Sequence, residues 1–184
     1  MLDPIKETAA YIAAKFGEIP STAIILGTGL GELAGHIDCK QELPYAEIPN
    51  FPLSTVEGHS GKLIVGNLGH RRILAMQGRF HYYEGYTMQQ VTFPVRVMQE
   101  LGVKTLFVSN AAGGMNPRFK VGDLMIITDH INTFPDNPLR GKNDEQRGPR
   151  FPDMSEAYTP RLIAKAKEIA RRNGIEVQEG VYVG

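Results

Sequence analysis

The segment GRFHYYEGY, residues 78–86, combines an arginine, a histidine, a glutamate and three tyrosines with two glycines. Arg79 and His81 alternate with Phe80, so in an extended chain both project from the same face. A guanidinium and an imidazole aimed at one point suit a small anion, most often a phosphate or a carboxylate. The alternative is a polar loop whose Arg79 and His81 face water or pair with a nearby acid. This segment alone leaves both interpretations open.

A glycine-rich loop, GTGLG at residues 27–31, directly follows the β-branched run TAIIL, which predicts a buried strand. Glu32 stands where a dinucleotide-binding fingerprint needs its third glycine, and no Walker pattern follows. The glycines free backbone amides to point at an anion, and the Thr28 hydroxyl adds a donor. The alternative interpretation is a tight strand-to-helix turn without a ligand.

A third loop, NAAGG at residues 110–114, follows another predicted buried strand, KTLFVS at 104–109. Its small side chains let a flat ligand or an oxyanion approach the backbone amides of Ala111 and Gly113, although close strand-helix packing explains them equally well. His59 lies in the glycine-rich turn TVEGHSGK. A lone loop histidine is more often a surface residue than a ligand. The sequence has no spacing typical of a glycosidase carboxylate pair, a metal site or a G-x-S-x-G elbow.

The helices and strands that must position these loops can be predicted from the spacing of apolar residues and from the capping residues, prolines and glycines that mark the ends of elements. A helix is expected to begin at Asp3-Pro4 and end at Gly17, and a second one to run from Thr87 to Gly102 with a kink or break at Pro94. The remaining predictions are a hairpin at 62–68 and 71–77, a strand at 121–129, a long loop at 131–152, a helix at 159–174 and a strand from 177. This order predicts a single α/β domain over residues 1–184, with a central mixed β-sheet flanked by helices.

Composition excludes several classes of protein. With 184 residues, 42% of them hydrophobic, the chain can bury one sizeable core. Its zero net charge argues against general binding to nucleic acid, and no segment approaches the roughly 20 apolar residues of a membrane span. A single cysteine, Cys39, excludes an intrachain disulfide and a thiolate zinc site. We therefore expect a cytoplasmic protein without a metal or a membrane partner.

Three strand ends, at Leu26, Gln77 and Ser109, run into loops that carry glycine, hydroxyl, arginine or histidine groups. In open α/β sheets, ligands bind in the crevice outside the carboxyl ends of the strands. Convergence of the three loops on one anion would explain all of them together.

The segments ILGTGLG, TVEGHSG, GRFHYYEGY, SNAAGGMNP, GDLMIITDHIN, NPLRG and RFPDMSEAY occur in this order. Together they closely resemble the trimeric purine nucleoside phosphorylases, and the resemblance runs from Lys15 to the last residue. It implies reversible phosphorolysis of inosine- or guanosine-type nucleosides by a homotrimer, with inorganic phosphate as co-substrate and no cofactor. The phosphate would be bound by Thr28, His59, Arg79, His81 and the amide of Ala111.

The resemblance also implies the nucleoside contacts. Tyr83 would bind the ribose and Tyr182 would lie beneath it, while Ala111, Ala112 and Gly113 would line the purine. Phe151 would reach into the site of a neighbouring subunit.

The sequence departs from this family at its end, because Gly184 precedes the family's purine-binding acid and asparagine. We therefore expect a chain that lacks roughly the last third of the family's length. The alternative function is an inactive fragment that retains a phosphate-binding site, and a nucleoside hydrolase is a weaker third possibility.

Overall fold

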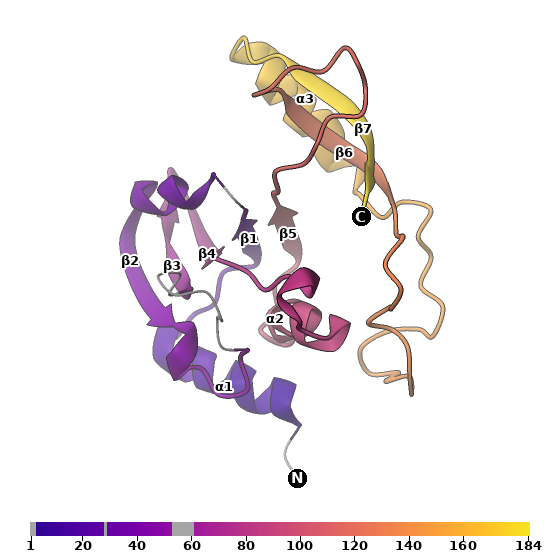
Figure 1. The fold of residues 1–184 in the computed structure, drawn as a ribbon. Coiled ribbons are helices and arrows are strands. Elements are labelled where there is room, and N and C mark those ends of the chain that lie inside the picture. Colours follow the sequence, from indigo (N-terminus) through magenta and orange to yellow (C-terminus); the bar gives the residue numbers. More distant parts are fainter. Residues whose placement is uncertain (1–2, 28, 53–60) are drawn as a thin grey trace. The chain divides into compact units, whose positions relative to one another are not determined.

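The structure, a computed structural model, describes residues 3–27, 29–52 and 61–184 of the chain. They divide into two compact units, Met1–Ala111 and Ala112–Gly184, and each unit is described by itself. The first unit contains a mixed β-sheet with helices packed on it, so the predicted α/β class is confirmed (Figure 1). That the whole chain forms a single domain stays a prediction.

The first unit is built on a five-stranded sheet with the order β2-β3-β4-β1-β5. Neighbours among β2, β3 and β4 are antiparallel, whereas β1 runs parallel to both β4 and β5. The predicted strand after residue 21 and the predicted hairpin are confirmed, and β2 is an addition to the prediction. The strands are β1 (Thr22–Leu26), β2 (Ile37–Pro44), β3 (Lys62–Leu68), β4 (Arg71–Gln77) and β5 (Thr105–Val108).

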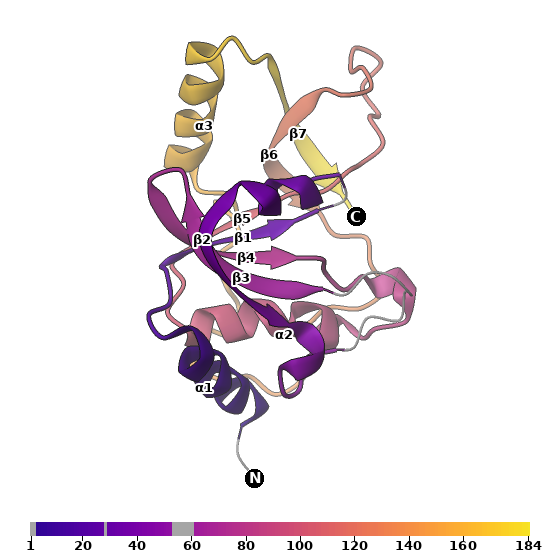
Figure 2. The same ribbon diagram turned by 90° about the vertical axis from the view of Figure 1, so that its left-hand side faces the viewer.

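Helices α1 (Pro4–Phe16) and α2 (Met88–Glu100) lie on the same face of this sheet (Figure 2). The Asp3 carboxylate caps α1 by accepting a hydrogen bond of 3.0 Å from the Ile5 amide, as the Asp-Pro start predicts. Thr87 and Gln90 cap α2 reciprocally, since each side chain accepts from the other residue's amide. The helix is continuous through Pro94, so the predicted break does not occur.

The core of the first unit has a layer on each face of the sheet. Because side chains alternate along a strand, Leu63 and Val65 pack toward the helices while Ile64 belongs to the cluster on the opposite face. On α2 the buried face includes Val97, whereas Val95 is exposed. Strand β5 is less buried than its apolar sequence predicts, with Phe107 and Val108 exposed by 47% and 52%, because it is an edge strand of this sheet.

Tyr45 links the hydrophobic core to the segment 78–86. It begins the short 3₁₀ helix η2 (Tyr45–Glu47), is only 4% exposed, and packs its ring against Phe51 and Phe80. Its hydroxyl donates a 2.7 Å hydrogen bond to the carbonyl of Gly78, which has a left-handed φ of 85°. Burial raises the pKa of Tyr45 well above its ordinary value of 10.0. Tyr45 therefore fixes the turn that precedes Arg79.

We expect Tyr45→Phe to lower the free energy of unfolding by about 1–2 kcal/mol, because the Gly78 carbonyl loses its donor in a buried place. Urea titration measures this change. The folded protein holds the Tyr45 proton at pH values where the unfolded chain has released it. Stability of the wild type should therefore fall as the pH rises above about 10, and less steeply in Tyr45→Phe.

The control for this change is Tyr11→Phe, which removes a hydroxyl from a partly exposed tyrosine of α1. We expect its unfolding free energy to stay within about 0.5 kcal/mol of the wild type. Equal losses in the two variants would contradict the role assigned to the Tyr45 hydroxyl.

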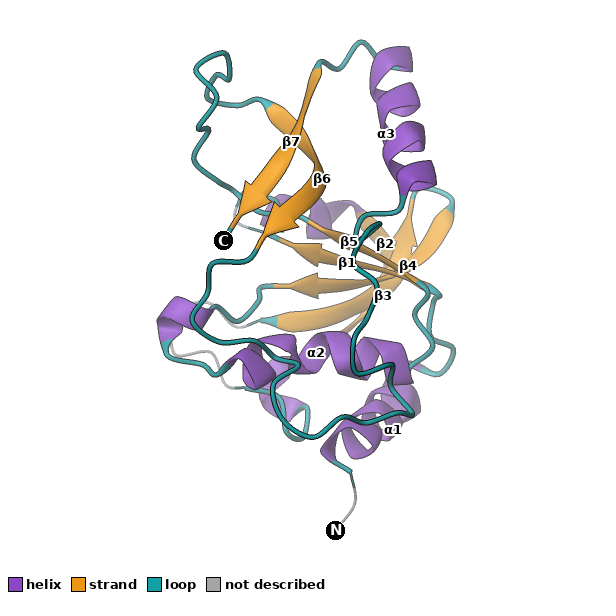
Figure 3. Ribbon diagram, turned by 90° about the vertical axis from the view of Figure 1, so that its right-hand side faces the viewer, coloured by secondary structure: helices purple, strands orange, loops and turns teal. Residues whose placement is uncertain are grey.

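In the second unit, β6 (Leu124–Ile131) pairs in parallel with β7 (Val177–Val183). Helix α3 (Pro160–Arg172) lies between these two strands in the sequence. Figure 3 shows these elements coloured by type, with the long connection between β6 and α3 drawn as loop. Both strands, the loop and the helix are confirmed close to their predicted bounds. Within the described part of the chain, no helix is both long and apolar enough to cross a membrane.

Candidate functional site

The carboxyl ends of β1, β4 and β5 lie at one edge of the first unit's sheet. Because β1 is parallel to both neighbours, Leu26 pairs with Gln77 and Ile25 pairs with Val108. The three loops that follow these strands therefore begin side by side. The described residues of this unit thus place the three strand ends together, the arrangement in which open α/β sheets bind ligands. Convergence of the loops on one anion stays a prediction.

Arg79 and His81 are in direct contact at this edge. The Arg79 Nε donates a 3.0 Å hydrogen bond to His81 Nε2, while Arg79 Nη1 donates to the Ser109 carbonyl at 2.5 Å. Phe80, between them, is buried in the core below. The predicted shared face of Arg79 and His81 is thus confirmed, and the guanidinium joins the loop after β4 to the end of β5.

Glu84 orients the His81 ring, a role that inspection of the sequence missed. It lies in the 3₁₀ helix η3 (Tyr82–Glu84), and its two carboxylate oxygens lie 3.0 Å from the His81 amide and 3.2 Å from His81 Nδ1. A carboxylate at Nδ1 and a guanidinium donor at Nε2 together favour a proton on Nδ1. The spacing His-x-x-Glu was a usable signal, because residues three apart meet in one helical turn.

Tyr83 covers the other side of the imidazole. The rings of His81 and Tyr83 are stacked, with centroids 4.7 Å apart and planes inclined by 17°. The Tyr83 side chain is 82% exposed, so its hydroxyl is available to a ligand. Arg79, His81 and Tyr83 thus form one contiguous group of hydrogen-bonding side chains.

The loop after β5 begins with Ser109, Asn110 and Ala111. The Ser109 side chain binds the first residue of the glycine-rich loop, because its oxygen accepts a 2.9 Å hydrogen bond from the Gly27 amide. Ala111 is exposed, and its carbonyl accepts from the Asn110 side chain at 3.3 Å. Two other predicted phosphate ligands, Thr28 and His59, lie outside the described residues. Their roles stay predictions.

The remaining predicted contacts belong to the second unit. Ala112 and Gly113 are exposed, and a Cβ atom added to Gly113 would meet no atom within 4 Å. Phe151 is 86% exposed in the long loop, where the Arg150 guanidinium carbon lies 5.9 Å from the centroid of its ring. Tyr182 of β7 pairs with His130 of β6. The roles of all four predicted residues stay predictions.

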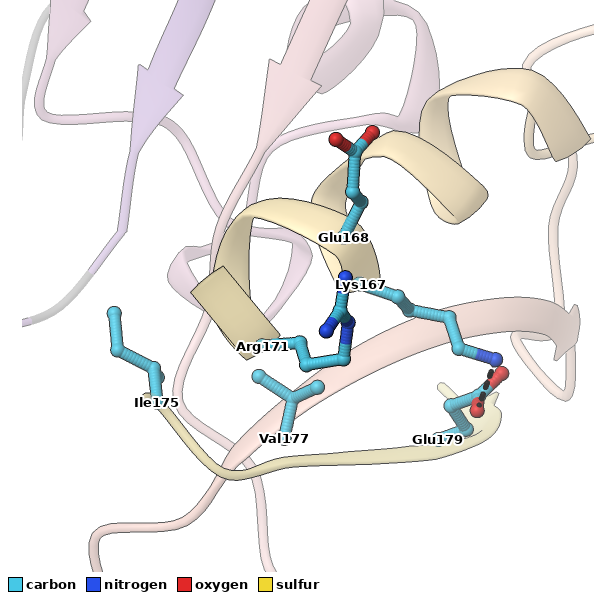
Figure 4. A pocket seen from close by; sticks show the side chains of 6 residues that line it. All are labelled: Lys167, Glu168, Arg171, Ile175, Val177 and Glu179. Atoms are coloured by element: carbon cyan, nitrogen blue, oxygen red, sulfur yellow. Dashed lines mark ion pairs between the residues drawn. The ribbon is translucent and has the colours of Figure 1, made fainter. Parts of the chain in front are cut away.

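A cavity of about 410 Å³ opens between α3 and β7 in the second unit (Figure 4). Its charges are largely paired: Lys167 forms an ion pair of 2.7 Å with Glu179, and Glu168 binds Lys165 and Arg172. Such exposed ion pairs contribute little to the free energy of folding. None of the predicted site residues lines this cavity, which is formed by Lys167, Glu168, Arg171, Ile175, Val177 and Glu179.

Titratable groups in the described ranges do not assemble a metal site, since no three His, Cys, Asp or Glu side chains gather there. The chemistry available at the strand ends is instead that of an anion site. It combines one guanidinium, one imidazole, a carboxylate that orients the imidazole, and an exposed tyrosine hydroxyl.

Comparison with known proteins places this arrangement in a family. Residues 21–184 match the family model of the phosphorylase superfamily. The chain is 56% identical over 179 residues to purine nucleoside phosphorylase 1 of Geobacillus stearothermophilus, covering 97% of this chain and 65% of that protein. The chain therefore spans just under two thirds of that relative's length.

Solved structures agree with the sequence match. One is a purine nucleoside phosphorylase in complex with ribose-1-phosphate, with a TM-score of 0.92 and 48% identity over 97% of this chain and 68% of that one. Another is the Schistosoma mansoni purine nucleoside phosphorylase in complex with inosine, with a TM-score of 0.92 and 46% identity over 98% of this chain and 65% of that one. The chain belongs to the phosphorylase superfamily and, within it, to the purine nucleoside phosphorylase family.

Proposed function

We propose that the protein catalyses reversible phosphorolysis of purine nucleosides of the inosine and guanosine type. The bond between the anomeric carbon and the purine nitrogen breaks, and a bond from that carbon to a phosphate oxygen forms. The products are a free purine, which leaves with the electron pair and takes up a proton, and ribose 1-phosphate or its deoxy form. The reaction needs inorganic phosphate and no cofactor.

The observation that carries this proposal is the contact between Arg79 and His81 at the shared edge of three strand ends. An arginine can bind a phosphate through two parallel hydrogen bonds. The imidazole of His81 would add a third donor when Nε2, which accepts from Arg79 in this structure, is protonated and faces the phosphate. Solved structures of relatives, one in complex with ribose-1-phosphate and another in complex with inosine, support phosphate and a purine nucleoside as the substrates.

The rate acceleration would come from positioning and electrostatics. Breaking the bond to the purine leaves positive charge on the sugar, and a phosphate dianion held against it stabilises that charge. Arg79 and His81 would fix the phosphate in line for attack rather than react covalently. No carboxylate nucleophile or metal is required for this chemistry.

The other roles complete the proposed site. Thr28, His59 and the Ala111 amide would also bind phosphate, and Tyr83 would bind the ribose, with Tyr182 beneath it. Ala111, Ala112 and Gly113 would line the purine, and Phe151 would complete the site of a neighbouring subunit in a homotrimer. A cytoplasmic location is part of the same proposal.

The test is release of hypoxanthine from inosine by the purified 184-residue chain, with phosphate and with sulfate at equal ionic strength. We expect release with phosphate only. Release in both buffers would indicate a hydrolase instead. Binding of phosphate without release would leave only the anion site and reject the activity for this chain.

We expect Glu84→Gln to weaken phosphate binding roughly tenfold, with little change in stability. The amide keeps the shape of the carboxylate, but its NH₂ group cannot accept a hydrogen bond, so one of the two contacts with His81 is lost. Calorimetric titration with phosphate measures the affinity. Nitrogen-15 spectra of the imidazole report which ring nitrogen carries the proton.

Glu47→Gln provides the matched control, because Glu47 is an exposed glutamate at the end of η2. It should leave both phosphate affinity and the His81 spectrum unchanged. Wild-type phosphate affinity in a folded Glu84→Gln protein would refute the orienting role of the carboxylate.

A further inference from the structure

Ser109 is the first residue after β5 and lies beside the end of β1. The regular pairing of these strands ends at Ile25 and Val108, immediately before it. Beyond that point the Ser109 amide still donates to the Ile25 carbonyl at 3.3 Å, and the Ser109 hydroxyl adds two hydrogen bonds, since it donates to the same carbonyl at 3.1 Å and accepts from the Gly27 amide at 2.9 Å. The backbone and the side chain of Ser109 together thus extend the contact between these two segments beyond the paired strands.

The Gly27 amide depends on this hydroxyl. Gly27 is buried, and it is the first residue of the glycine-rich loop. A buried amide without an acceptor is costly, so removing the hydroxyl would favour movement of Gly27 toward another acceptor. The start of the loop would then no longer be fixed against β5.

The backbone of Ser109 also holds Arg79. The carbonyl of this residue accepts the 2.5 Å hydrogen bond from Arg79 Nη1. The first residue after β5 therefore contacts both the loop after β1 and the guanidinium that follows β4. Displacement of Ser109 would move two parts of the proposed anion site at once.

We propose that Ser109 is a positioning residue for phosphate binding. It does not contact the phosphate itself, but it fixes two groups of the proposed anion site, the Gly27 amide and the Arg79 guanidinium. This proposal rests on the proposed phosphorolysis, because it assigns phosphate as the ligand at this strand edge. The hydroxyl keeps the Gly27 amide in place, and through the shared backbone it keeps the Ser109 carbonyl under Arg79.

The competing explanation is that Ser109 only strengthens the sheet. The positioning role and the purely structural role predict different effects of a Ser109 substitution on phosphate affinity. A residue that only joins strands changes the unfolding free energy of the phosphate-free protein, whereas a positioning residue also changes the dissociation constant for phosphate. Thr105→Val is the matched control, because it removes a hydroxyl at the opposite end of the same strand, where Thr105 pairs with Thr22.

The experiment measures the dissociation constant for inorganic phosphate and the unfolding midpoint without phosphate in four variants of the 184-residue chain. We expect Ser109→Ala to raise the dissociation constant about tenfold, corresponding to the loss of one well-placed contact. Ser109→Thr, which keeps the hydroxyl, should restore most of the affinity. Thr105→Val should shift only the unfolding midpoint. Arg79→Ala serves as the reference for loss of the anion site.

Ser109→Cys covers the case in which Ser109→Ala does not fold. The thiol fills a similar volume but forms weak hydrogen bonds, so we expect a folded protein with weakened phosphate binding. Wild-type affinity in a folded Ser109→Ala or Ser109→Cys protein would overturn the positioning role while leaving phosphorolysis intact. Absence of phosphate binding in the wild type, or equal affinity in Arg79→Ala, would overturn the proposed function itself.

Discussion

Replacement of Arg79 by alanine should raise the dissociation constant for phosphate at least a hundredfold, the largest loss of binding expected from a single side chain here. The guanidinium contributes a full positive charge and a planar set of donors. Truncating one partner of a desolvated, hydrogen-bonded charge pair costs about 2–5 kcal/mol, and about 2.7 kcal/mol corresponds to a hundredfold change. Calorimetric titration of the purified chain with inorganic phosphate measures the effect.

Two further variants test the phosphate affinity that we assign to Arg79: one separates its charge from its geometry, and the other removes an arginine elsewhere. Arg79→Lys keeps the charge but loses the donor pair that reaches both His81 and Ser109, so we expect it to recover only part of the affinity. Arg72→Ala removes an exposed arginine near the start of β4, the strand that precedes Arg79, and should bind phosphate like the wild type. Equal affinity in Arg79→Ala and Arg72→Ala would exclude Arg79 from the phosphate site.

Most of the elements could be predicted because their sequence signals are local. Capping residues and glycines mark the ends of the helices, and β-branched runs mark β1 and β3. Strand β2 was missed because its sequence, IDCKQELP, is mostly polar and exposed, with an irregular register between Asp38 and Gln41. Its place in the sheet is set by pairing with β3, a long-range contact that no local pattern encodes.

Local strand geometry allows one part of the candidate site, the pair Arg79 and His81, to be predicted from the sequence. Arg79 and His81 are two residues apart on an extended segment, so their common face follows from strand geometry. The role of Ser109 could not be found in this way, because its partners Gly27 and Ile25 are more than 80 residues away in sequence. Only the parallel pairing of β1 with β5 brings them together.

The exposure of β5 departs from prediction for a related reason. An apolar run predicts burial, but it does not say how many neighbouring strands the sheet supplies. Phe107 and Val108 are exposed because the sheet of the first unit ends at β5. Burial of a strand is a property of the layers around it, whereas the existence of the strand is a property of its own residues.

Gly27→Ala should be the most destabilising single substitution at the strand edge. A Cβ atom on Gly27 would lie 2.7 Å from the Ser109 carbonyl carbon and closer still to its oxygen. Both are backbone atoms, so the clash can be relieved only by separating β1 from β5, which also lengthens the hydrogen bond between the Gly27 amide and Ser109. We expect a loss of about 3 kcal/mol in the free energy of unfolding, measured by urea titration.

Gly35→Ala separates this clash from the general effect of replacing a glycine. Gly35 lies in the 3₁₀ helix η1 (Gly31–His36), and an added Cβ there would meet no atom within 4 Å. Its variant should therefore be as stable as the wild type or slightly more stable, since alanine restricts the unfolded chain. Similar stability of Gly27→Ala and Gly35→Ala would mean that β1 and β5 do not approach this closely. A large loss in Gly27→Ala alone, together with weaker phosphate binding by its folded fraction, would tie the proposed anion site to the closeness of the two strands.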